Sequence, residues 1–219
     1  MSANLIDLVQ RLGQPRVLVV GDLMLDRYVW GDAERISQEA PVILLRAERR
    51  EERLGGASSV ATMVRALGAR VSLAGVVGAD HDGRQICRLM TDLGIDHEAV
   101  LFDEHRASTV KERYIGRAQA RHPQQIVRVD YEVRAALPGP LEAQLAHVVA
   151  QQLRRADIVL FSDYDKGVCT PGCWPAPSPG RGPWGCGRWP TRSAAATTAS
   201  TTAARPSRPT ASRPGWRRG

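Results

Sequence analysis

The chain has 219 residues, enough for one or two domains with a sizeable core. Its apolar fraction of 43% is ordinary for a globular protein, and it contains no run of the roughly 18–20 apolar residues that a membrane-spanning helix requires. The first residues lack the basic start and apolar core of a secretory signal, so we expect a cytoplasmic protein. The net charge of +7 comes from residues 169–219, which hold eight arginines and no acidic residue. Residues 1–168 are close to neutral, with 22 basic and 23 acidic side chains, which gives no reason to expect binding to nucleic acid or membrane.

Apolar runs and helical apolar faces alternate along residues 16–168. Three helices are predicted from apolar residues at helical spacing: one that follows Gly55–Gly56 and ends at Gly68, one over Asp82–Leu93, and one over Leu141–Leu153. The first of these should bury Val60, Met63, Val64 and Leu67. Strands are predicted over Arg16–Gly21, Tyr28–Trp30, Val42–Arg46, Val71–Val77, Val100–Phe102, Thr109–Ile115, Ile126–Val129 and Ile158–Phe161.

This alternation predicts an α/β fold with a mostly parallel sheet and flanking helices. The early β segments, about residues 28–53, are expected to form a small separate β flap, or lid. Because Ile158–Phe161 is the last apolar strand, we expect it to form an unpaired sheet edge.

The composition changes abruptly after Val168. Residues 169–219 contain no Leu, Ile, Val, Met or Phe, and they hold nine of the 14 prolines and four of the five tryptophans. Such a segment has too few aliphatic side chains to offset the entropy of ordering, so we expect it to be a disordered tail.

Three explanations of this tail are considered. Arginines interleaved with Trp could contact phosphates, and Cys169, Cys173 and Cys186 could hold a metal, although their spacing matches no standard zinc pattern. The third explanation is translation in the wrong frame of a GC-rich gene. A codon assignment for Gly182–Thr198, read two bases later, gives an apolar strand and a D-P-K turn, and the same shift of Arg205–Ala211 gives T-V-T-P-N-R. We therefore expect a single-base insertion or deletion near codons 166–172.

Two polar motifs follow predicted strands. In VVGDLMLDRY, Asp22 and Asp26 come directly after the first strand, at the sheet edge where ligands bind in open α/β folds. Carboxylates there can accept hydrogen bonds from sugar hydroxyls, or they can simply cap a turn. In GGASSVA, Gly55 and Gly56 precede a helix N-terminus, which favours an oxygen-rich ligand or is only a tight loop.

Four basic or hydroxyl side chains form a second group of candidates. Lys111 and Arg113 alternate on one face of the strand TVKERYI and could hold a substrate phosphate, or they could line a solvated face. Arg35 and Ser37, in the turn between the flap strands, carry the same two interpretations. GADHDG lacks the later ligands of a calcium loop, so it is interpreted as a strand-to-helix turn with a capping Asp.

Together these segments resemble the ribokinase (PfkB-like) carbohydrate kinases. Gly55, Gly56, Ala57, Ala61, Gly68 and Gly78 match the spacing of the first family signature, and Ser59 stands where the family usually has Asn. Four stretches, GDLMLDRYVWG, ERISQEAPV, QQIVRVD and SDYDKGV, are similar to heptose 7-phosphate kinases of lipopolysaccharide-core synthesis, including the kinase domain of bifunctional heptose kinase/adenylyltransferases. The resemblance covers about 150 residues, within 16–168.

The resemblance implies a ribokinase-like fold and transfer of the ATP γ-phosphoryl group, assisted by Mg²⁺, to the anomeric hydroxyl of D-glycero-β-D-manno-heptose 7-phosphate. It also implies a lid that closes over the sugar phosphate and forms a homodimer contact. The substrate-contacting positions that it implies, together with the two flap-turn candidates, are Asp22, Asp26, Arg35, Ser37, Gly55, Gly56, Ser59, Lys111, Arg113, Asp163 and Lys166.

The second family signature, Asp-Thr-x-Gly-Ala-Gly-Asp, does not occur in the 219 residues. It would supply the general base and the glycine-rich anion hole, so we expect residues 1–168 to be the N-terminal part of a kinase domain that lacks the C-terminal, ATP-binding half, and to be inactive. Two alternatives stay open: a non-catalytic remnant that binds sugar phosphate or dimerises, and another PfkB-type sugar kinase.

Overall fold

The structure is a computed structural model, and it describes residues 13–117, 122–170 and 195–198. Two sheets make up the fold, a five-stranded parallel sheet in the order β5-β4-β1-β8-β9 and a four-stranded sheet in the order β3-β2-β6-β7. Within the described residues, no helix is long and apolar enough to cross a membrane. The elements are β1 (Arg16–Gly21), β2 (Leu23–Ile36), β3 (Ile43–Gly55), α2 (Gly56–Ala66), β4 (Arg70–Gly78), α3 (His81–Asp92), β5 (Asp96–Asp103), β6 (Thr109–Arg117), β7 (Gln124–Tyr131), α4 (Gly139–Leu153), β8 (Ile158–Ser162) and β9 (Ala195–Thr198).

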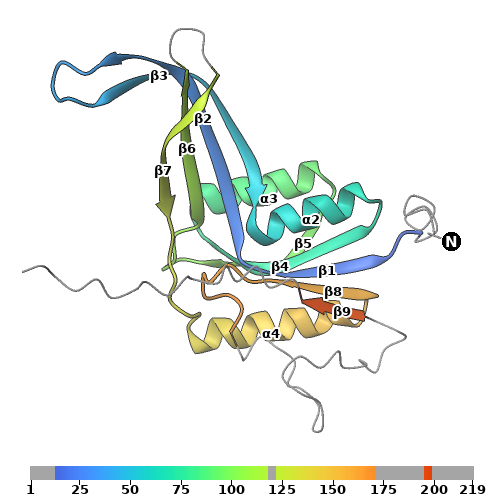
Figure 1. The fold of residues 1–219 in the computed structure, drawn as a ribbon. Coiled ribbons are helices and arrows are strands. Elements are labelled where there is room, and N and C mark those ends of the chain that lie inside the picture. The colour runs from blue at the N-terminus through green and yellow to red at the C-terminus, as the bar shows by residue number, and fades with distance from the viewer. Residues whose placement is uncertain (1–12, 118–121, 171–194, 199–219) are drawn as a thin grey trace, which may run out of the picture.

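The five-stranded sheet is the centre of the body, with α2 and α3 on one face and α4 on the other (Figure 1). Strand β1 explains this arrangement, because its apolar run alternates between the two faces. Val17 and Val19 pack in the cluster that α2 and α3 cover, whereas Leu18 and Val20 pack in the cluster that α4 covers. The predicted α/β body with a mostly parallel sheet is confirmed.

The four-stranded sheet is the predicted flap, and it stands off from the body (Figure 1). The flap is larger than residues 28–53, because β6 runs parallel to β2 and β7 completes the sheet. The predicted segments Tyr28–Trp30 and Val42–Arg46 are parts of two long antiparallel strands, β2 and β3. Charged residues fill much of these strands, so their apolar pattern gave only fragments of their length.

Helix α2 lies where it was predicted, and two of the four predicted apolar residues, Val60 and Val64, pack partly buried against the core. Met63 and Leu67 are 64% and 66% exposed, so the prediction that they face the core is wrong. The side that meets the sheet is formed by fully buried Ala57 and Ala61 and by Ser58. Small side chains allow α2 to lie close to the sheet, and this close approach favours them over the larger apolar residues.

The two other helices confirm their predicted positions. Asp80, in the GADHDG turn, caps α3, and its carboxylate accepts a hydrogen bond of 2.7 Å from the Gly83 N–H. Helix α4 buries Leu145, Val149 and Leu153. The capping residue of α3 and the apolar spacing of α4 were therefore sufficient to predict where these two helices lie.

The prediction that Ile158–Phe161 forms an unpaired edge is wrong. Strand β9 lies parallel to β8, with Ile158 opposite Ala195 and Phe161 opposite Thr198. A strand edge offers backbone N–H and C=O groups that any extended segment can pair with, whatever its side chains. Apart from residues 169–170 and β9, the predicted disordered tail lies outside the described residues.

Candidate functional site

The carboxyl end of β1 is fixed by a buried carboxylate. Asp22 is 1% exposed, and its oxygens accept backbone hydrogen bonds from Tyr164 (2.7 Å), Lys166 (3.3 Å) and Val168 (3.2 Å). Burial raises the pKa of the Asp22 carboxyl above its ordinary value, against these three hydrogen bonds, which lower it. Asp22 therefore holds the segment of residues 163–168 against β1, a role that the sequence did not predict. Its predicted contact with substrate stays a prediction.

The Gly55–Gly56 pair brings β3 and α2 close to the same edge. A Cβ on Gly55 would lie 2.9 Å from Cγ of Asp26, and one on Gly56, where φ is +57°, would collide with the carbonyl oxygen of Asp22. Ser58 is fully buried, and its hydroxyl donates to the Gly55 carbonyl at 2.6 Å. Ser59, the predicted contact, is half-buried in the first turn of α2 and makes no side-chain hydrogen bond to the described residues.

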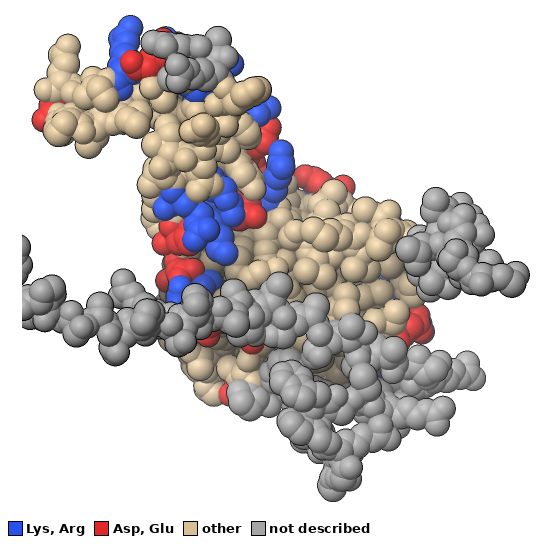
Figure 2. Space-filling view, in the orientation of Figure 1, with Lys and Arg blue, Asp and Glu red and all other residues tan. Residues whose placement is uncertain are grey.

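One face of the flap carries a cluster of charged and aromatic side chains close to the body. Asp26, on β2, accepts a hydrogen bond of 2.9 Å from Arg113, on β6. The Arg113 guanidinium also lies over the Tyr28 ring, 5.1 Å from its centroid, and Arg53 lies over the same ring at 5.2 Å. Figure 2 shows Lys and Arg atoms beside Asp and Glu atoms where the flap meets the largely uncharged surface of the body.

Lys111 differs from the arginines around it. It stands between Asp26 and Asp130 in the strand register, but no carboxylate in the described residues lies within 4 Å of its ammonium. Its Nζ lies 5.9 Å from the ring centroid of Tyr164, which belongs to the 163–168 segment. Lys111 is therefore a half-buried cation, between flap and body, that is not neutralised by an ion pair.

The predicted residues of the SDYDKGV stretch lie in a tight turn. Asp163 is exposed, and its side chain accepts a hydrogen bond from the Asp165 N–H at 2.9 Å. Lys166 is 7% exposed, and its ammonium lies 2.9 Å from a carboxylate oxygen of Glu132. The hydrogen bond from Lys166 lowers the pKa of Glu132. The predicted substrate contacts of Asp163 and Lys166 stay predictions.

Arg35 and Ser37 lie at the far end of the flap, apart from the other candidates. Arg35 is exposed and stands opposite Leu44, and Ser37 accepts a hydrogen bond from the Glu39 N–H at 3.2 Å. Nine residues of strand separate Arg35 from Asp26, a distance of roughly 30 Å. The structure brings together Asp26, Lys111 and Arg113 with the Gly pair and the 163–168 segment, but not these two residues.

Two residues near the candidate site, Tyr164 and Arg106, were not selected from the sequence. Tyr164 was considered only as part of the SDYDKGV stretch. An aromatic residue between two carboxylates, Asp163 and Asp165, directly after a strand is a pattern that could have selected it as a site residue. Arg106 gave no signal, because it lies in an irregular loop. Its guanidinium donates to the carbonyls of Lys166 (2.8 Å) and Ala135 (2.5 Å). A narrow cleft beside it is lined by Asp22, Leu23, Val76, Arg106, Ala107, Ser108, Thr109, Lys166 and Val168.

Comparisons with known proteins agree with this arrangement. The family model described as pfkB family carbohydrate kinase matches residues 14–173. The chain is 49% identical over 162 residues to a protein named D-beta-D-heptose 7-phosphate kinase from Bordetella bronchiseptica, covering 73% of this chain and 48% of the relative. It is 42% identical over 153 residues to the Bifunctional protein HldE of Helicobacter pylori, covering 70% of this chain and 32% of the relative.

A solved carbohydrate kinase from Agrobacterium tumefaciens has a similar fold, with a TM-score of 0.52 and 16% identity over 68% of this chain and 45% of that one. This likeness confirms the predicted ribokinase-like fold. The chain spans about half the length of the Bordetella relative and about a third of the Helicobacter relative. Since the family model covers most of the chain, and since the Gly pair, the flap and the strand-end carboxylates lie together, the chain belongs to the pfkB family of carbohydrate kinases.

Proposed function

We propose that this chain carries the sugar-phosphate half of a heptose 7-phosphate kinase active site. In that reaction the γ-phosphoryl group of ATP passes to the anomeric hydroxyl of D-glycero-β-D-manno-heptose 7-phosphate. The observation that carries the proposal is Lys111, an ammonium with no acidic partner among the described residues, beside the Asp26–Arg113 pair and Tyr164. The name of the Bordetella relative supports the choice of sugar.

Each charged group has a distinct role in this proposal. Lys111 is free to approach the 7-phosphate, and as a point charge it tolerates several phosphate orientations. Arg113 is held by Asp26 and by the Tyr28 ring, so its remaining N–H groups point in fixed directions and can add a second contact to the phosphate. The carboxylate of Asp26 can accept hydrogen bonds from sugar hydroxyls with the oxygen that Arg113 leaves free.

The family implies ATP and Mg²⁺ as the other participants in phosphoryl transfer. The Asp-Thr-x-Gly-Ala-Gly-Asp signature, which would supply the general base, is absent from the sequence. We therefore expect this 219-residue chain to bind the sugar phosphate without transferring a phosphoryl group.

Calorimetric titration tests the proposal. Heptose 7-phosphate should bind the chain at least about tenfold more tightly than heptose without phosphate, since a charge-assisted contact contributes about 1.5–3 kcal/mol. Lys111→Gln should reduce this preference to the contact that Arg113 still makes, whereas Arg46→Gln, at an exposed flap arginine paired with Asp32, should keep it in full. Equal binding of heptose and heptose 7-phosphate would contradict the proposed phosphate site. Formation of heptose bisphosphate from ATP would contradict the expected inactivity.

The end of the flap supports a homodimer as a second part of the proposal. Ile36, Val42, Ile43 and Leu44 are 64%, 55%, 52% and 45% exposed, so apolar side chains lie on both faces of the flap end, where a second copy would cover them. Ile43→Glu should shift the mass measured by sedimentation from dimer to monomer. A wild-type chain that sediments as a monomer at all concentrations would refute this part.

For residues after Val168 the proposal is a change of reading frame. The end of the family match at residue 173, close to the loss of aliphatic residues, supports it. Sequencing of the DNA across codon 168 tests it, since an intact frame without kinase-like codons downstream would contradict it.

A further inference from the structure

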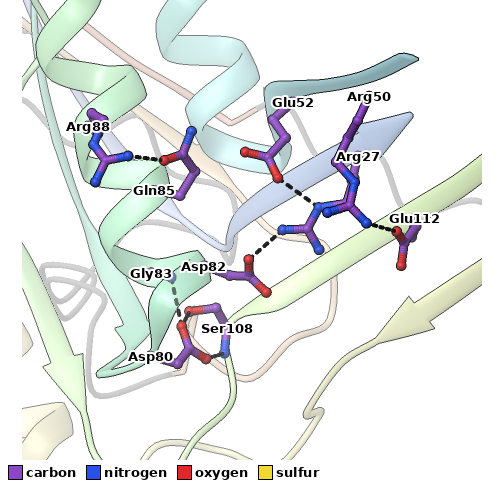
Figure 3. Close-up of polar contacts among 10 residues, drawn as sticks. All are labelled: Arg27, Arg50, Glu52, Asp80, Asp82, Gly83, Gln85, Arg88, Ser108 and Glu112. Atoms are coloured by element: carbon purple, nitrogen blue, oxygen red, sulfur yellow. Dashed lines mark hydrogen bonds and ion pairs between the residues drawn. The ribbon is translucent and has the colours of Figure 1, made fainter. Parts of the chain in front are cut away.

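The base of the flap has a second polar face, which the proposed substrate site does not use. Side chains alternate along β2, so Asp26 and Arg27 lie on opposite faces of the flap. Asp26 contacts Arg113 on the face that carries Lys111, whereas Arg27 contacts Asp82 in the first turn of α3 (Figure 3). Arg27 is therefore linked, through the same stretch of strand, to Asp26 and to its neighbour Lys111 on the opposite face.

Arg27 joins the flap to the body. Its Nε donates to Glu52, on flap strand β3, at 2.7 Å, and its Nη2 donates to Asp82 at 2.5 Å. The side chains of Arg27, Glu52 and Asp82 are 12%, 20% and 27% exposed, so solvent screens these pairs less than the surface pairs elsewhere on the flap. Within the described residues, Arg27–Asp82 is the one ion pair between a flap strand and a helix of the body. Arg50, in the same view, pairs with Glu112 inside the flap.

The helix end that Arg27 contacts is itself fixed. Asp80, two residues before Asp82, accepts hydrogen bonds from the N–H (2.8 Å) and the hydroxyl (2.7 Å) of Ser108. Ser108 directly precedes β6, the strand that carries Lys111. The first turn of α3 thus holds the flap at two points, β6 through Asp80 and β2 through Asp82 (Figure 3).

We infer that Arg27 is a positioning residue, which sets the tilt of the flap on the body and thereby holds Lys111 against Tyr164. The inference deepens the proposed function, because it concerns the same site, and it rests on that function only for the identity of the substrate. Without the Arg27–Asp82 pair, the flap should swing away from the 163–168 segment and leave the Lys111 ammonium open to solvent.

The lysine content of the chain allows a direct test without substrate. Lys111 and Lys166 are its only lysines, one on the flap and one in the body. Pulse labelling of the whole chain with an amine reagent, followed by peptide mass spectrometry, measures each side-chain rate separately. Arg27→Met should raise the Lys111 rate at least about threefold, as expected for the loss of a partly buried ion pair, and should leave the Lys166 rate unchanged.

Two further variants make the test decisive. Asp82→Asn breaks the same pair from the body side and should raise the Lys111 rate similarly, which also covers the case in which Arg27→Met fails to fold. Arg46→Met removes an exposed pair within the flap and should change neither rate. Unchanged Lys111 rates in both Arg27→Met and Asp82→Asn would overturn the inference, and so would parallel increases at Lys111 and Lys166, which indicate general unfolding. Loss of heptose 7-phosphate binding with normal labelling would count against the proposed function alone.

Discussion

The body sheet and the flap sheet are built from different residues and held by different forces. Strands β1 and β4 of the body bury apolar side chains on both faces, as Leu18 and Leu73 illustrate with no exposed surface. The flap strands present charged side chains on both faces, with Arg113–Asp26 on one side and Arg27–Glu52 on the other. Burial fixes the body and the base of the flap, where Leu25, Leu54 and Val110 join the core, whereas backbone pairing and ion pairs shape the rest of the flap. Apolar burial therefore accounts for most of the stability of the body, whereas the charged side chains of the flap are available for the proposed binding of sugar phosphate.

The largest expected effect separates the two sheets by stability. Leu18→Ala should lower the free energy of unfolding by about 2–5 kcal/mol, because it leaves a cavity between β1 and α4. Val127→Ala, at a 47% exposed position of the flap, should cost less than about 0.5 kcal/mol. Urea denaturation followed by circular dichroism measures both values. Equal losses would show that the flap depends on apolar burial as much as the body does.

An intermediate effect is expected where the two sheets meet. Gly56→Ala should destabilise the chain by about 1–3 kcal/mol, since φ at this position is +57° and the added methyl would collide with the Asp22 carbonyl. Gly139→Ala is the matched control, because its added Cβ has open space at the start of α4. The control should cost less than Gly56→Ala, because only the following Pro140 restricts a Cβ at this position. The same denaturation experiment measures both variants, and a neutral Gly56→Ala would contradict the close approach of α2.

The smallest effect concerns a surface ion pair of the body. Hydrogen bonds from Arg16 lower the pKa of Asp157 to about 2, against a value of about 3.9 in an unfolded chain. Ionised Asp157 therefore stabilises the fold above about pH 4, and this contribution is lost as the pH falls from about 4 to about 2. The stability difference between wild type and Asp157→Asn should shrink over that window. It should be small and weaken with salt, because both side chains are largely exposed. A pH-independent difference would show that the ion pair contributes nothing.

The sequence predicted the body more completely than the flap, for a physical reason. Apolar runs such as Arg16–Gly21 and the helical spacing of Leu145, Val149 and Leu153 follow directly from burial. The flap strands contain many charged residues and therefore lack a continuous apolar pattern, so only short fragments of β2 and β3 were predicted. Strand β9 pairs with β8 through backbone groups, so the side-chain pattern of the sequence did not predict this pairing.

Part of the candidate site was also predictable. Asp26, Lys111 and Arg113 were chosen from strand position and charge, and the structure brings them together. The internal role of Asp22 was hidden, because its partners are backbone N–H groups about 140 residues away in the sequence. Arg27 was not selected, since a lone arginine on a strand gives no hint of a carboxylate that a distant helix supplies.

Protection of the two lysines by ligand tests the proposed phosphate site in the unmodified chain, because it reports on the Lys111 ammonium itself. Saturating heptose 7-phosphate should slow amine labelling of Lys111 at least about fivefold, because the bound phosphate engages the Lys111 ammonium in a charge-assisted hydrogen bond. Lys166, held by Glu132, should change much less, and heptose without phosphate should have no effect. Unchanged labelling of Lys111 with saturating heptose 7-phosphate would contradict a phosphate site at the base of the flap.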